Sequence, residues 1–598
     1  MKVDILKRFK ENVRYYYEYL GWRIFPLLGI GLFVGLLDGF GLAMFVPLLE
    51  MAADGEPSSG ESMGNLKFII DSIEFLGLGI SLYSVLVTMI FFFVFKGIAV
   101  YVSNYLYAVY SELFIRSIRV QNIDALSNYS FTSFVKADAG NIQNSMSGEV
   151  QKVAKNFQMF VYMVRTGLIL LTYIGLAFLA NPQFSVLVII GGLISHLIFY
   201  KLYKKTEQLG IDLVKSNHAF QGLLIQEVNF FKYLKATGLV KEFSKYLKNK
   251  VYDLEDQNRR VGILRAIMQG SREPIMILLV VMIILIQVEY LGGELGAIIL
   301  ALLFFYRGLS TLMSLLDSYN SYLSTIGSLQ NMKTFTNELI SNKENERTHV
   351  NTVENFEIEI QNLYFSYNGN QDYILKDINL SIEENETVAF VGESGAGKTT
   401  LVNVIAGLLK PSKGTVKIGS SGLDDIDMNQ YRKSIGYITQ EPVIFDDTVF
   451  NNVTFWGEKS EKNIARFNKA LKKAGIFDFV QQLDHKEESR LGNNGISLSG
   501  GQRQRISIAR ELYKNVNILM MDEATSALDS ETELVIQKNI EKLQGEHTIL
   551  IIAHRLSTIK NADRVVIMED GKIERVGTYD ELVNNSVSFR RMVELQEV

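Results

Sequence analysis

The first half of the chain contains apolar stretches long enough to cross a lipid bilayer as helices. Such a crossing needs about 20 predominantly apolar residues. We expect six spans, at residues 25–49, 80–107, 161–180, 184–203, 268–290 and 295–316. The apolar run of the fifth, Ile275–Val288, is too short alone and gains length only by extending back past Arg272. A re-entrant segment is the alternative at this position.

The distribution of basic residues predicts the orientation of these spans. Lys and Arg are concentrated before the first span and in the connections that follow the second and fourth spans. By contrast, the connection Glu50–Gly79 holds Lys67 as its single basic residue against six acidic ones. Since Lys and Arg are enriched in cytoplasmic loops, we expect both termini and the second half of the chain to lie in the cytoplasm.

The connections predicted to be cytoplasmic are long and polar, but they keep helical spacing of apolar residues. Leu223, Val228, Phe231 and Leu234 illustrate this spacing after the fourth span, and it indicates a long helical hairpin below the membrane. A separate small soluble insertion is the alternative. On the other side, the apolar positions of Asn65–Leu76 predict a short amphipathic helix lying on the outer surface of the membrane.

The pattern changes after the last span, where hydropathy falls and a polar, charged stretch follows. We therefore expect a membrane domain at residues 1–330, a linker at 331–353 and a soluble domain at 354–598. The soluble domain begins with alternating strand-like runs.

In this second domain, the apolar strand Thr387–Val391 runs into a glycine-rich loop and then into the predicted helix Thr400–Leu409. This is the context of a phosphate-binding loop, in which backbone N–H groups and the helix N-terminus attract phosphate oxygens. We expect Lys398 to neutralise the β- and γ-phosphates of a nucleotide and the Thr399 hydroxyl to bind Mg²⁺. The predicted nucleotide-binding residues are Gly392, Glu393, Ser394, Gly395, Ala396, Gly397, Lys398, Thr399 and Thr400.

A second apolar run, Ile518–Met521, ends in two acidic residues and is typical of a buried parallel strand. The carboxyl end of such a strand is where ligands bind in α/β sheets. We expect Asp522 to hold Mg²⁺ and Glu523 to act as the general base that activates the attacking water.

The run Leu498–Gln502, reading Leu-Ser-Gly-Gly-Gln, lies between the phosphate loop and this acidic pair. With these motifs, the chain from Phe356 to its C-terminus resembles the ATP-binding-cassette (ABC) ATPases, and the membrane half resembles an exporter of that superfamily. The resemblance implies six transmembrane helices with long cytoplasmic extensions, followed by an α/β P-loop NTPase domain. It also implies ATP hydrolysis coupled to transport, in the cytoplasmic membrane of a bacterium.

The same resemblance implies roles for residues outside the phosphate loop. Tyr367 matches the aromatic residue that stacks on adenine, and Gln440 matches a catalytic glutamine that contacts Mg²⁺ and water. His554 matches the histidine that orients the γ-phosphate and the base, and Asp529 matches the loop that communicates between two sites. The signature residues expected to clamp the γ-phosphate from the opposite subunit are Ser499, Gly500, Gly501 and Gln502.

Each ABC motif occurs once, so the resemblance implies that a second chain completes both ATP sites. A homodimer is the economical assembly, and a heterodimer with a different half-transporter is the alternative. One departure from the family pattern is Asn493, which stands where many similar exporters carry an acidic residue. This departure puts in doubt the usual charge contact between that loop and the membrane helices.

Bulk composition excludes few functions. The net charge of −5 gives no reason to expect nucleic acid as a partner. The absence of cysteine excludes disulfides, thiolate metal sites and thiol catalysis.

Ionisable residues within the spans are the candidates for substrate contact, because charge inside a membrane is costly. These are Lys96, Arg307 and Asp38. Lys96 and Arg307 lining a dimer cavity would suit an anionic headgroup; the alternative is internal pairing of Asp38 with Lys96. With the predicted outer helix, they resemble features of bacterial lipid-linked oligosaccharide and lipid A flippases. We expect export or flipping of an anionic amphiphile, namely a lipid-linked oligosaccharide or related glycolipid. A drug or peptide exporter and an ATP-regulated receptor or channel are the alternatives.

Overall fold

The computed structural model describes residues 2–54, 61–75, 77, 79–180, 182–291, 295–344, 353, 355–367, 372–492, 495, 498–522, 537–553, 555 and 559–597. The chain forms two units. The first comprises Met1–Asn128 and Asp138–Asn342, and the second comprises Tyr129–Ala137 and Lys343–Val598. The domain boundaries expected from hydropathy stay predictions.

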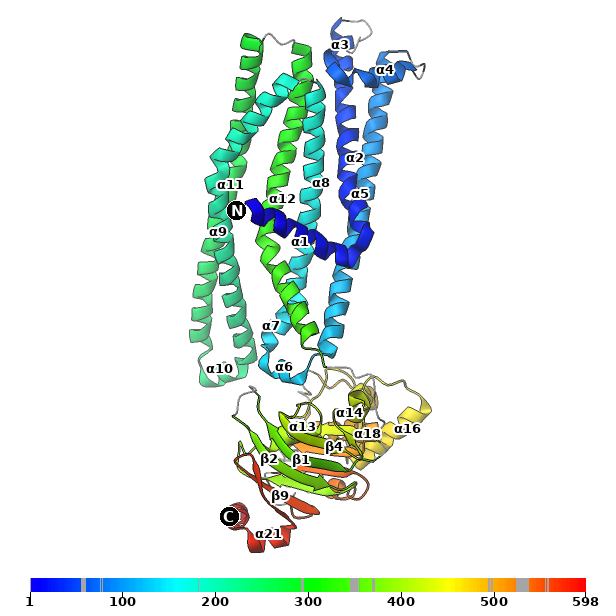
Figure 1. Cartoon of the computed structure of the whole chain (residues 1–598), viewed down its shortest axis with the longest axis vertical. Helices are drawn as coiled ribbons and strands as arrows, with labels where there is room; N and C mark the ends of the chain where they lie inside the picture. The colour runs from blue at the N-terminus through cyan, green and yellow to red at the C-terminus, as the bar shows by residue number, and fades with distance from the viewer. Residues whose placement is uncertain are drawn as a thin grey trace. The chain divides into compact units, whose positions relative to one another are not determined.

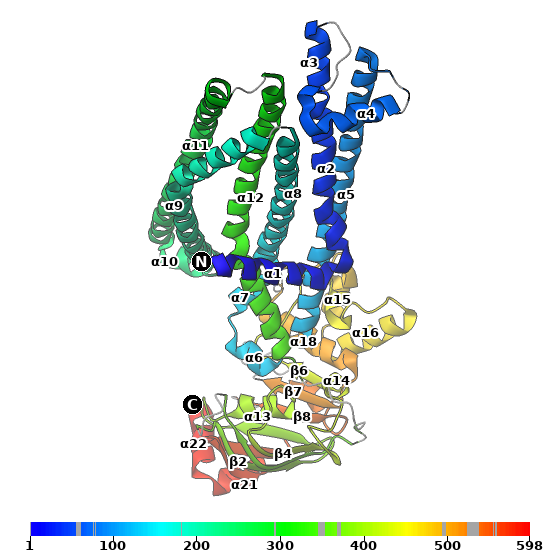
Figure 2. The same cartoon turned by 45° about the horizontal axis from the view of Figure 1, so that its top comes forward.

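The first unit is built from long helices (Figures 1 and 2). Its α-helices are α1 (Lys2–Leu20), α2 (Ile24–Ala43), α3 (Phe45–Asp54), α4 (Phe68–Phe75), α5 (Leu82–Ser127), α7 (Ala139–Asn144), α8 (Val150–Ala180), α9 (Pro182–Asn229), α10 (Phe231–Thr237), α11 (Val240–Leu291) and α12 (Leu295–Ser341). Two 3₁₀ turns, η1 (Gly21–Arg23) and η2 (Glu61–Lys67), and a π-helical turn, η3 (Ser145–Glu149), interrupt them.

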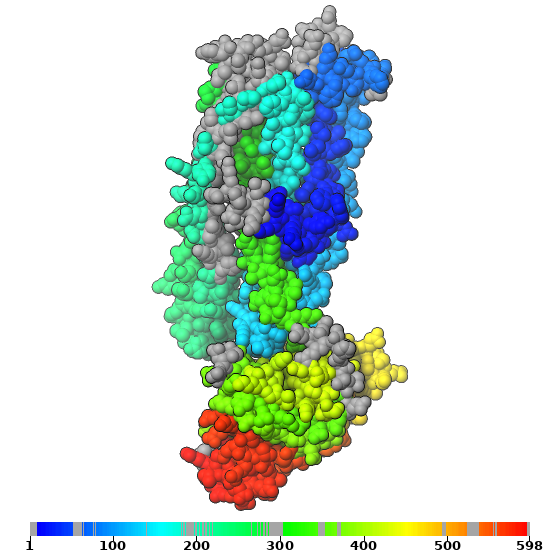
Figure 3. Space-filling model, in the orientation of Figure 1, coloured from blue at the N-terminus to red at the C-terminus, as the bar shows by residue number. Residues whose placement is uncertain are grey.

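Helix α1, drawn dark blue, runs across the long helices rather than along them (Figures 1 to 3). Polar side chains fix it in this position. The Tyr16 hydroxyl donates to Asn156 Oδ1 of α8 at 2.7 Å, and Asn12 Nδ2 donates to the Tyr322 hydroxyl of α12 at 2.5 Å. Because these groups are buried, the bonds compensate for lost hydration and hold α1 in one register.

Helices α9 and α11 form the long hairpin that the apolar spacing predicts. They contain 48 and 52 residues, which at about 1.5 Å per residue gives lengths of about 72 and 78 Å. A bilayer core is only about 30 Å thick. Helix α11 continues without interruption through Pro274. Whether the fifth span crosses the membrane or is re-entrant stays a prediction.

Among the residues that the structure describes, three helical stretches are long and apolar enough to cross a membrane. They are Phe9–Met51, Leu82–Ser127 and Gly140–Ala180. The first and third of these stretches contain the first and third expected spans, and the second contains all but the first two residues of the second expected span. Much of residues 184–203, 268–290 and 295–316 lies outside the described side chains. The fourth to sixth spans therefore stay predictions at the level of side chains, although their backbone is helical.

The helical segment between the first two expected spans corrects one prediction. Residues 61–75 form η2 and α4 as expected from their spacing, but their apolar side does not face lipid. Leu66, Ile69, Ile70 and Ile73 are at most 4% exposed and pack in a core with residues of α2, α5, α8 and α12. Burial against protein satisfies the same apolar face that a membrane surface would have covered.

The second unit contains two sheets and the helices packed on them. Its strands are β1 (Ile358–Phe365), β2 (Leu375–Ile382), β3 (Thr387–Val391), β4 (Lys413–Ile418), β5 (Ser421–Gly422), β6 (Ile435–Ile438), β7 (Ile518–Asp522), β8 (Thr548–Ile552), β9 (Arg564–Glu569) and β10 (Lys572–Gly577). Its α-helices are α6 (Phe131–Lys136), α13 (Lys398–Ile405), α14 (Met428–Lys433), α15 (Val449–Thr454), α16 (Glu461–Lys473), α17 (Phe477–Gln482), α18 (Gly500–Lys514), α21 (Tyr579–Asn585) and α22 (Val587–Glu597).

One sheet has the order β2–β1–β4–β5, and the other has the order β10–β9–β3–β8–β7–β6. Strands β3, β6, β7, β8 and β9 of the second sheet pair in parallel. Alternate residues of β3 enter different cores: Val388 and Phe390 belong to one, and Ala389 and Val391 to the other. Burial on both faces explains why this strand reads as a continuous apolar run.

Candidate functional site

The parallel sheet brings the ends of the motif-bearing strands to one edge. In the register of the sheet, Phe390 of β3 pairs with Ile552 of β8, and Ile552 pairs with Asp522 of β7. Ile438 of β6 pairs with Met521 of β7. Gln440 lies two residues after Ile438 in the sequence. The segments that follow these four strands therefore start from the same carboxyl edge, where open α/β sheets bind ligands.

The phosphate loop follows β3 and takes backbone conformations that only glycine adopts readily. The φ angles of Gly392, Gly395 and Gly397 are +146°, +88° and +96°. A Cβ atom on Gly392 would lie 2.1 Å from the carbonyl oxygen of Met568 in β9. Glycine at this first position therefore allows the loop to leave β3 against the backbone of the neighbouring strand.

Lys398 begins helix α13 directly after this loop. Its side chain is only 5% exposed, and Nζ donates to the carbonyl oxygens of Gly392 at 2.7 Å and Glu393 at 2.9 Å. The loop thus wraps the ammonium group, as a phosphate loop with a lysine requires. Thr399, the next residue, is exposed on the first turn of α13.

Asp522 ends β7 in a largely apolar strand. The pKa of Tyr437 is raised to about 12, mainly because its hydroxyl is buried and to a smaller extent because the Asp522 carboxylate is nearby. Tyr437 therefore stays protonated at neutral pH, and its hydroxyl donates to Asn403 Oδ1 of α13 at 3.2 Å. This link between β6, β7 and α13 was missed by sequence reasoning, because a tyrosine in an apolar strand carries no motif.

The residues predicted to hold Mg²⁺ can be tested for chemical fit. Asp522 supplies a carboxylate, Thr399 a hydroxyl and Gln440 an amide oxygen, which are the oxygen ligands that Mg²⁺ prefers. Thr399 and Gln440 are exposed at the ends of their elements, and Asp522 is half-buried at the end of β7. The donor set fits the ion.

Tyr367, two residues after β1, is half-buried. Its ring packs edge-to-face on Phe365, with centroids 4.9 Å apart and an interplanar angle of 86°. Part of the ring stays accessible, so Tyr367 contributes to the core and can also offer a face to a base. Its role as the adenine contact stays a prediction.

The signature residues form the start of α18. Ser499 is its N-cap, and the two side chains form a capping box: Gln502 N donates to Ser499 Oγ at 3.2 Å, and Ser499 N donates to Gln502 Oε1 at 2.8 Å. Gln502 therefore has a structural role that the sequence reasoning did not assign. Ser499 is exposed, whereas Gly501 is buried against the helix.

Several predicted site residues lie outside the described part of the chain. They are Glu523, Asp529 and His554, together with the departing residue Asn493. Their roles stay predictions.

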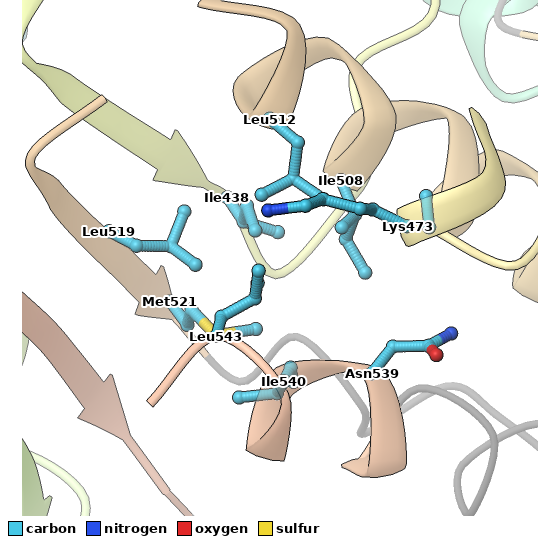
Figure 4. Close-up of a pocket in the computed structure, with 10 residues that line it drawn as sticks. Ile438, Lys473, Ile508, Leu512, Leu519, Met521, Asn539, Ile540 and Leu543 are labelled. Atoms are coloured by element: carbon cyan, nitrogen blue, oxygen red, sulfur yellow. The ribbon is translucent and has the colours of Figure 1, made fainter. Parts of the chain in front are cut away.

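A small apolar pocket lies elsewhere in this unit (Figure 4). It is lined by Ile438, Lys473, Ala474, Ile508, Leu512, Leu519, Met521, Asn539, Ile540 and Leu543. Lys473 points its ammonium group to Glu546, with 3.1 Å between Nζ and Oε2. None of the residues predicted to bind ATP lines this pocket, so we do not assign it to the nucleotide.

In the first unit, two of the three predicted substrate residues are paired with each other. Lys96 Nζ donates to Asp38 Oδ1 at 2.6 Å, which is the internal pairing that the sequence left open. The Tyr173 hydroxyl of α8 donates to the second oxygen, Asp38 Oδ2. Sequence reasoning missed Tyr173, although a phenol within an apolar span is a signal for a buried polar partner. Arg307 of α12 is exposed.

Two family models match the chain. Residues 32–312 match the "ABC transporter transmembrane region", and residues 375–526 match the model described as "ABC transporter". The matched segments cover the expected membrane half and the phosphate loop, signature and acidic pair.

Curated relatives and a solved structure are similar over long stretches. An "ATP-dependent lipid A-core flippase" of Acinetobacter baylyi is 29% identical over 594 residues, covering 96% of this chain and 97% of that protein. A "Putative multidrug export ATP-binding/permease protein" of Staphylococcus aureus is 41% identical over 241 residues, covering 40% of this chain and 41% of that protein. A bacterial Atm1-family ABC exporter structure with ATP bound aligns with a TM-score of 0.75 at 20% identity, covering 96% of this chain and 98% of that one.

Proposed function

Because the chain belongs to the ABC transporters, as an exporter half-transporter with one membrane domain and one ATPase domain, we propose that two identical copies move an anionic, lipid-linked substrate across the membrane. It is a multi-pass membrane protein that hydrolyses ATP to drive export. The proposal adds three points: the homodimer, the placement in a bacterial cytoplasmic membrane with both termini inside, and the class of substrate.

The ATP site that we propose is shared between two chains. Lys398 and the loop amides of one chain hold the phosphates, and Ser499, Gly500 and Gly501 of the second chain close over the γ-phosphate. Closure favours one arrangement of the membrane helices, and hydrolysis removes the bridge, so ATP acts by shifting a conformational population.

We assign hydrolysis itself to Glu523 and His554, which come shortly after the β7 and β8 segments in the sequence. Glu523 accepts a proton from the attacking water, and His554 orients the γ-phosphate. Asp522, Thr399 and Gln440 hold Mg²⁺, which when bound supplies positive charge to the β- and γ-phosphates.

The exposed arginine of α12 carries the substrate proposal. Arg307 lies on a helix within the expected sixth span and is exposed in the single chain. A guanidinium facing lipid is costly, so intramembrane arginines face water-filled cavities or protein. There Arg307 can bind phosphate oxygens bidentately. The name of the Acinetobacter relative, a lipid A-core flippase, supports an anionic lipid.

The experiment uses the full chain in phosphatidylcholine vesicles with one of two fluorescent lipids, a labelled phosphatidic acid or a labelled phosphatidylcholine. We expect ATPase activity and dithionite-detected flipping to respond to the phosphatidic acid. Arg307→Gln should remove this preference, whereas Arg116→Gln, an exposed arginine of α5 with 62% side-chain exposure, should keep it. Equal responses of the unmodified protein to both lipids would overturn the anionic substrate.

A multidrug exporter is the second candidate, because the Staphylococcus relative carries that name. Its match covers only 40% of this chain, whereas the match to the Acinetobacter relative covers 96%. Activity stimulated by neutral or cationic apolar drugs, with no preference for the lipid phosphate, would favour this candidate.

A further inference from the structure

A buried carboxylate lies at the centre of a polar cluster in the first unit. Asp38 of α2 is 4% exposed. One of its oxygens accepts from Lys96 Nζ of α5 at 2.6 Å, and the other accepts from the Tyr173 hydroxyl of α8. Both oxygens therefore have a donor, which compensates for the loss of hydration. The carboxylate ties three helices together.

The two members of the ion pair differ in their exposure. The Asp38 side chain is 6% exposed, whereas the Lys96 side chain is 26% exposed. An ammonium group has three N–H donors, and the bond to Asp38 uses one. Nζ also lies 5.4 Å from the centroid of the Phe93 ring, a weak attraction at a partly exposed site. A ligand can reach the cation but not the carboxylate.

Arg307 lies on α12, next to a residue that contacts Tyr173. The next residue, Gly308, packs on the same tyrosine, since a Cβ atom built there would lie 3.7 Å from Tyr173 Cβ. Helix α12, which carries the exposed Arg307, therefore packs against the tyrosine that donates to Asp38.

We propose that Asp38 is an internal counter-ion that competes with the anionic headgroup of the substrate for Lys96. This inference rests on the proposed function, since it requires an anionic substrate. The headgroup binds Arg307 first and then draws Lys96 from Asp38, while Tyr173 keeps its hydrogen bond to the carboxylate. When the helices move, Asp38 recovers Lys96 and the headgroup is released.

Such a counter-ion would allow the substrate to be released from its binding site. A transported ion must bind strongly enough to enter a site and weakly enough to leave it. Without Asp38, each chain would offer two positive charges, and a homodimer four. With Asp38 the cluster carries one net positive charge in each chain, so a dimer carries two, which matches a phosphate monoester of about −1.5 to −2 at pH 7. Asp38 is therefore a positioning residue that limits affinity.

The test measures ATPase activity of the full chain in phosphatidylcholine vesicles as the fraction of phosphatidic acid is raised. Asp38→Asn should lower the half-saturating fraction by roughly tenfold, a change worth about 1.4 kcal/mol in binding. It should also lower the maximal stimulated rate, because release becomes slow. The matched control is Asp124→Asn, the same change at an exposed position of α5, which should alter neither quantity.

Lys96→Gln should act in the opposite direction and raise the half-saturating fraction. The double variant Asp38→Asn/Lys96→Gln keeps the approximate shape of the pair without its charges. It replaces Asp38→Asn in the test if that single variant does not fold. We expect the double variant to have a higher half-saturating fraction than Asp38→Asn, because the headgroup can no longer draw on Lys96. Equal half-saturating fractions for Asp38→Asn and the double variant would show that Lys96 takes no part in binding, and that result would overturn the proposal.

The proposal is also wrong if Asp38→Asn lowers the melting temperature and leaves the half-saturating fraction unchanged or raised. This failure is distinct from failure of the proposed function. The function fails when the unmodified protein does not distinguish phosphatidic acid from phosphatidylcholine, or when Arg307→Gln keeps the preference. The counter-ion proposal is refuted when both of those results are as expected but Asp38→Asn does not lower the half-saturating fraction of phosphatidic acid.

Discussion

Replacing Gly392 by alanine should abolish tight ATP binding through a single backbone contact. The new Cβ atom would lie 2.1 Å from the Met568 carbonyl oxygen, and real Cβ contacts are essentially never shorter than 3.0 Å. The two atoms must therefore separate by about 0.9 Å. Met568 cannot move easily, because β9 pairs with both β3 and β10. The phosphate loop has to shift instead.

The size of the effect follows from that shift. A misplacement of about 1 Å in a catalytic site can reduce the rate by about 100-fold. The positive φ of +146° at Gly392 adds a conformational cost of about 1–2 kcal/mol for any L-residue. Gly395→Ala is the matched control, because its φ is +88° but a Cβ atom there meets nothing within 4 Å. Gly395→Ala therefore has the conformational cost of a positive φ angle but no steric clash with a neighbouring strand.

The assay titrates both variants with a fluorescent ATP analogue and measures ATP turnover and the melting temperature of each. We expect Gly392→Ala to bind the analogue at least tenfold more weakly than Gly395→Ala and to hydrolyse ATP about 100-fold more slowly than the unmodified protein. Melting temperatures should be similar for the two variants. Equal affinity of the two variants would refute the reasoning, because the collision with β9 would then have no consequence.

Three further outcomes are expected. Glu523→Gln should keep ATP binding, lose hydrolysis and accumulate as a nucleotide-bound dimer by mass photometry; a monomer with bound ATP would contradict the shared site. Arg510→Met should destabilise the ATPase unit by about 2–4 kcal/mol in denaturant titrations, because the buried guanidinium donates to Asn452 O, Asn452 Oδ1 and Val443 O; an unchanged midpoint would show that these acceptors find other donors. EDTA should stop hydrolysis and added Mg²⁺ should restore it, whereas activity that persists in EDTA would remove the metal assignment.

Local patterns were sufficient to predict much of the ATPase half. Thr387–Val391 reads as a buried strand, and it is β3. The glycines of the next loop have the positive φ angles that such a loop needs, and Ile518–Met521 lies in β7. These features depend on residues adjacent in sequence, so period, turn chemistry and strand length identify them.

Contacts between distant segments were not predictable in the same way. Lys96 is 58 residues from Asp38, and the sequence offered both substrate contact and internal pairing for them. Tyr173 is 135 residues from Asp38 and has no motif around it. The segment before α5 shows the same limit: spacing predicted a helix with an apolar face, but whether Ile70 faces lipid or protein depends on how other helices pack.

The two halves of the ATP site that we propose lie at the starts of different helices of one chain. The phosphate loop leads into the N-terminus of α13 beside Lys398, where we propose that the phosphates bind. The signature leads into another helix N-terminus, that of α18, with exposed Ser499 as its cap. The first N–H groups of an α-helix lack partners within the helix and carry partial positive charge. In the assembly that we propose, a nucleotide bound at α13 of one chain also meets the N-terminus of α18 of the second chain, so two identical chains paired head to tail would use both helix ends with two nucleotides.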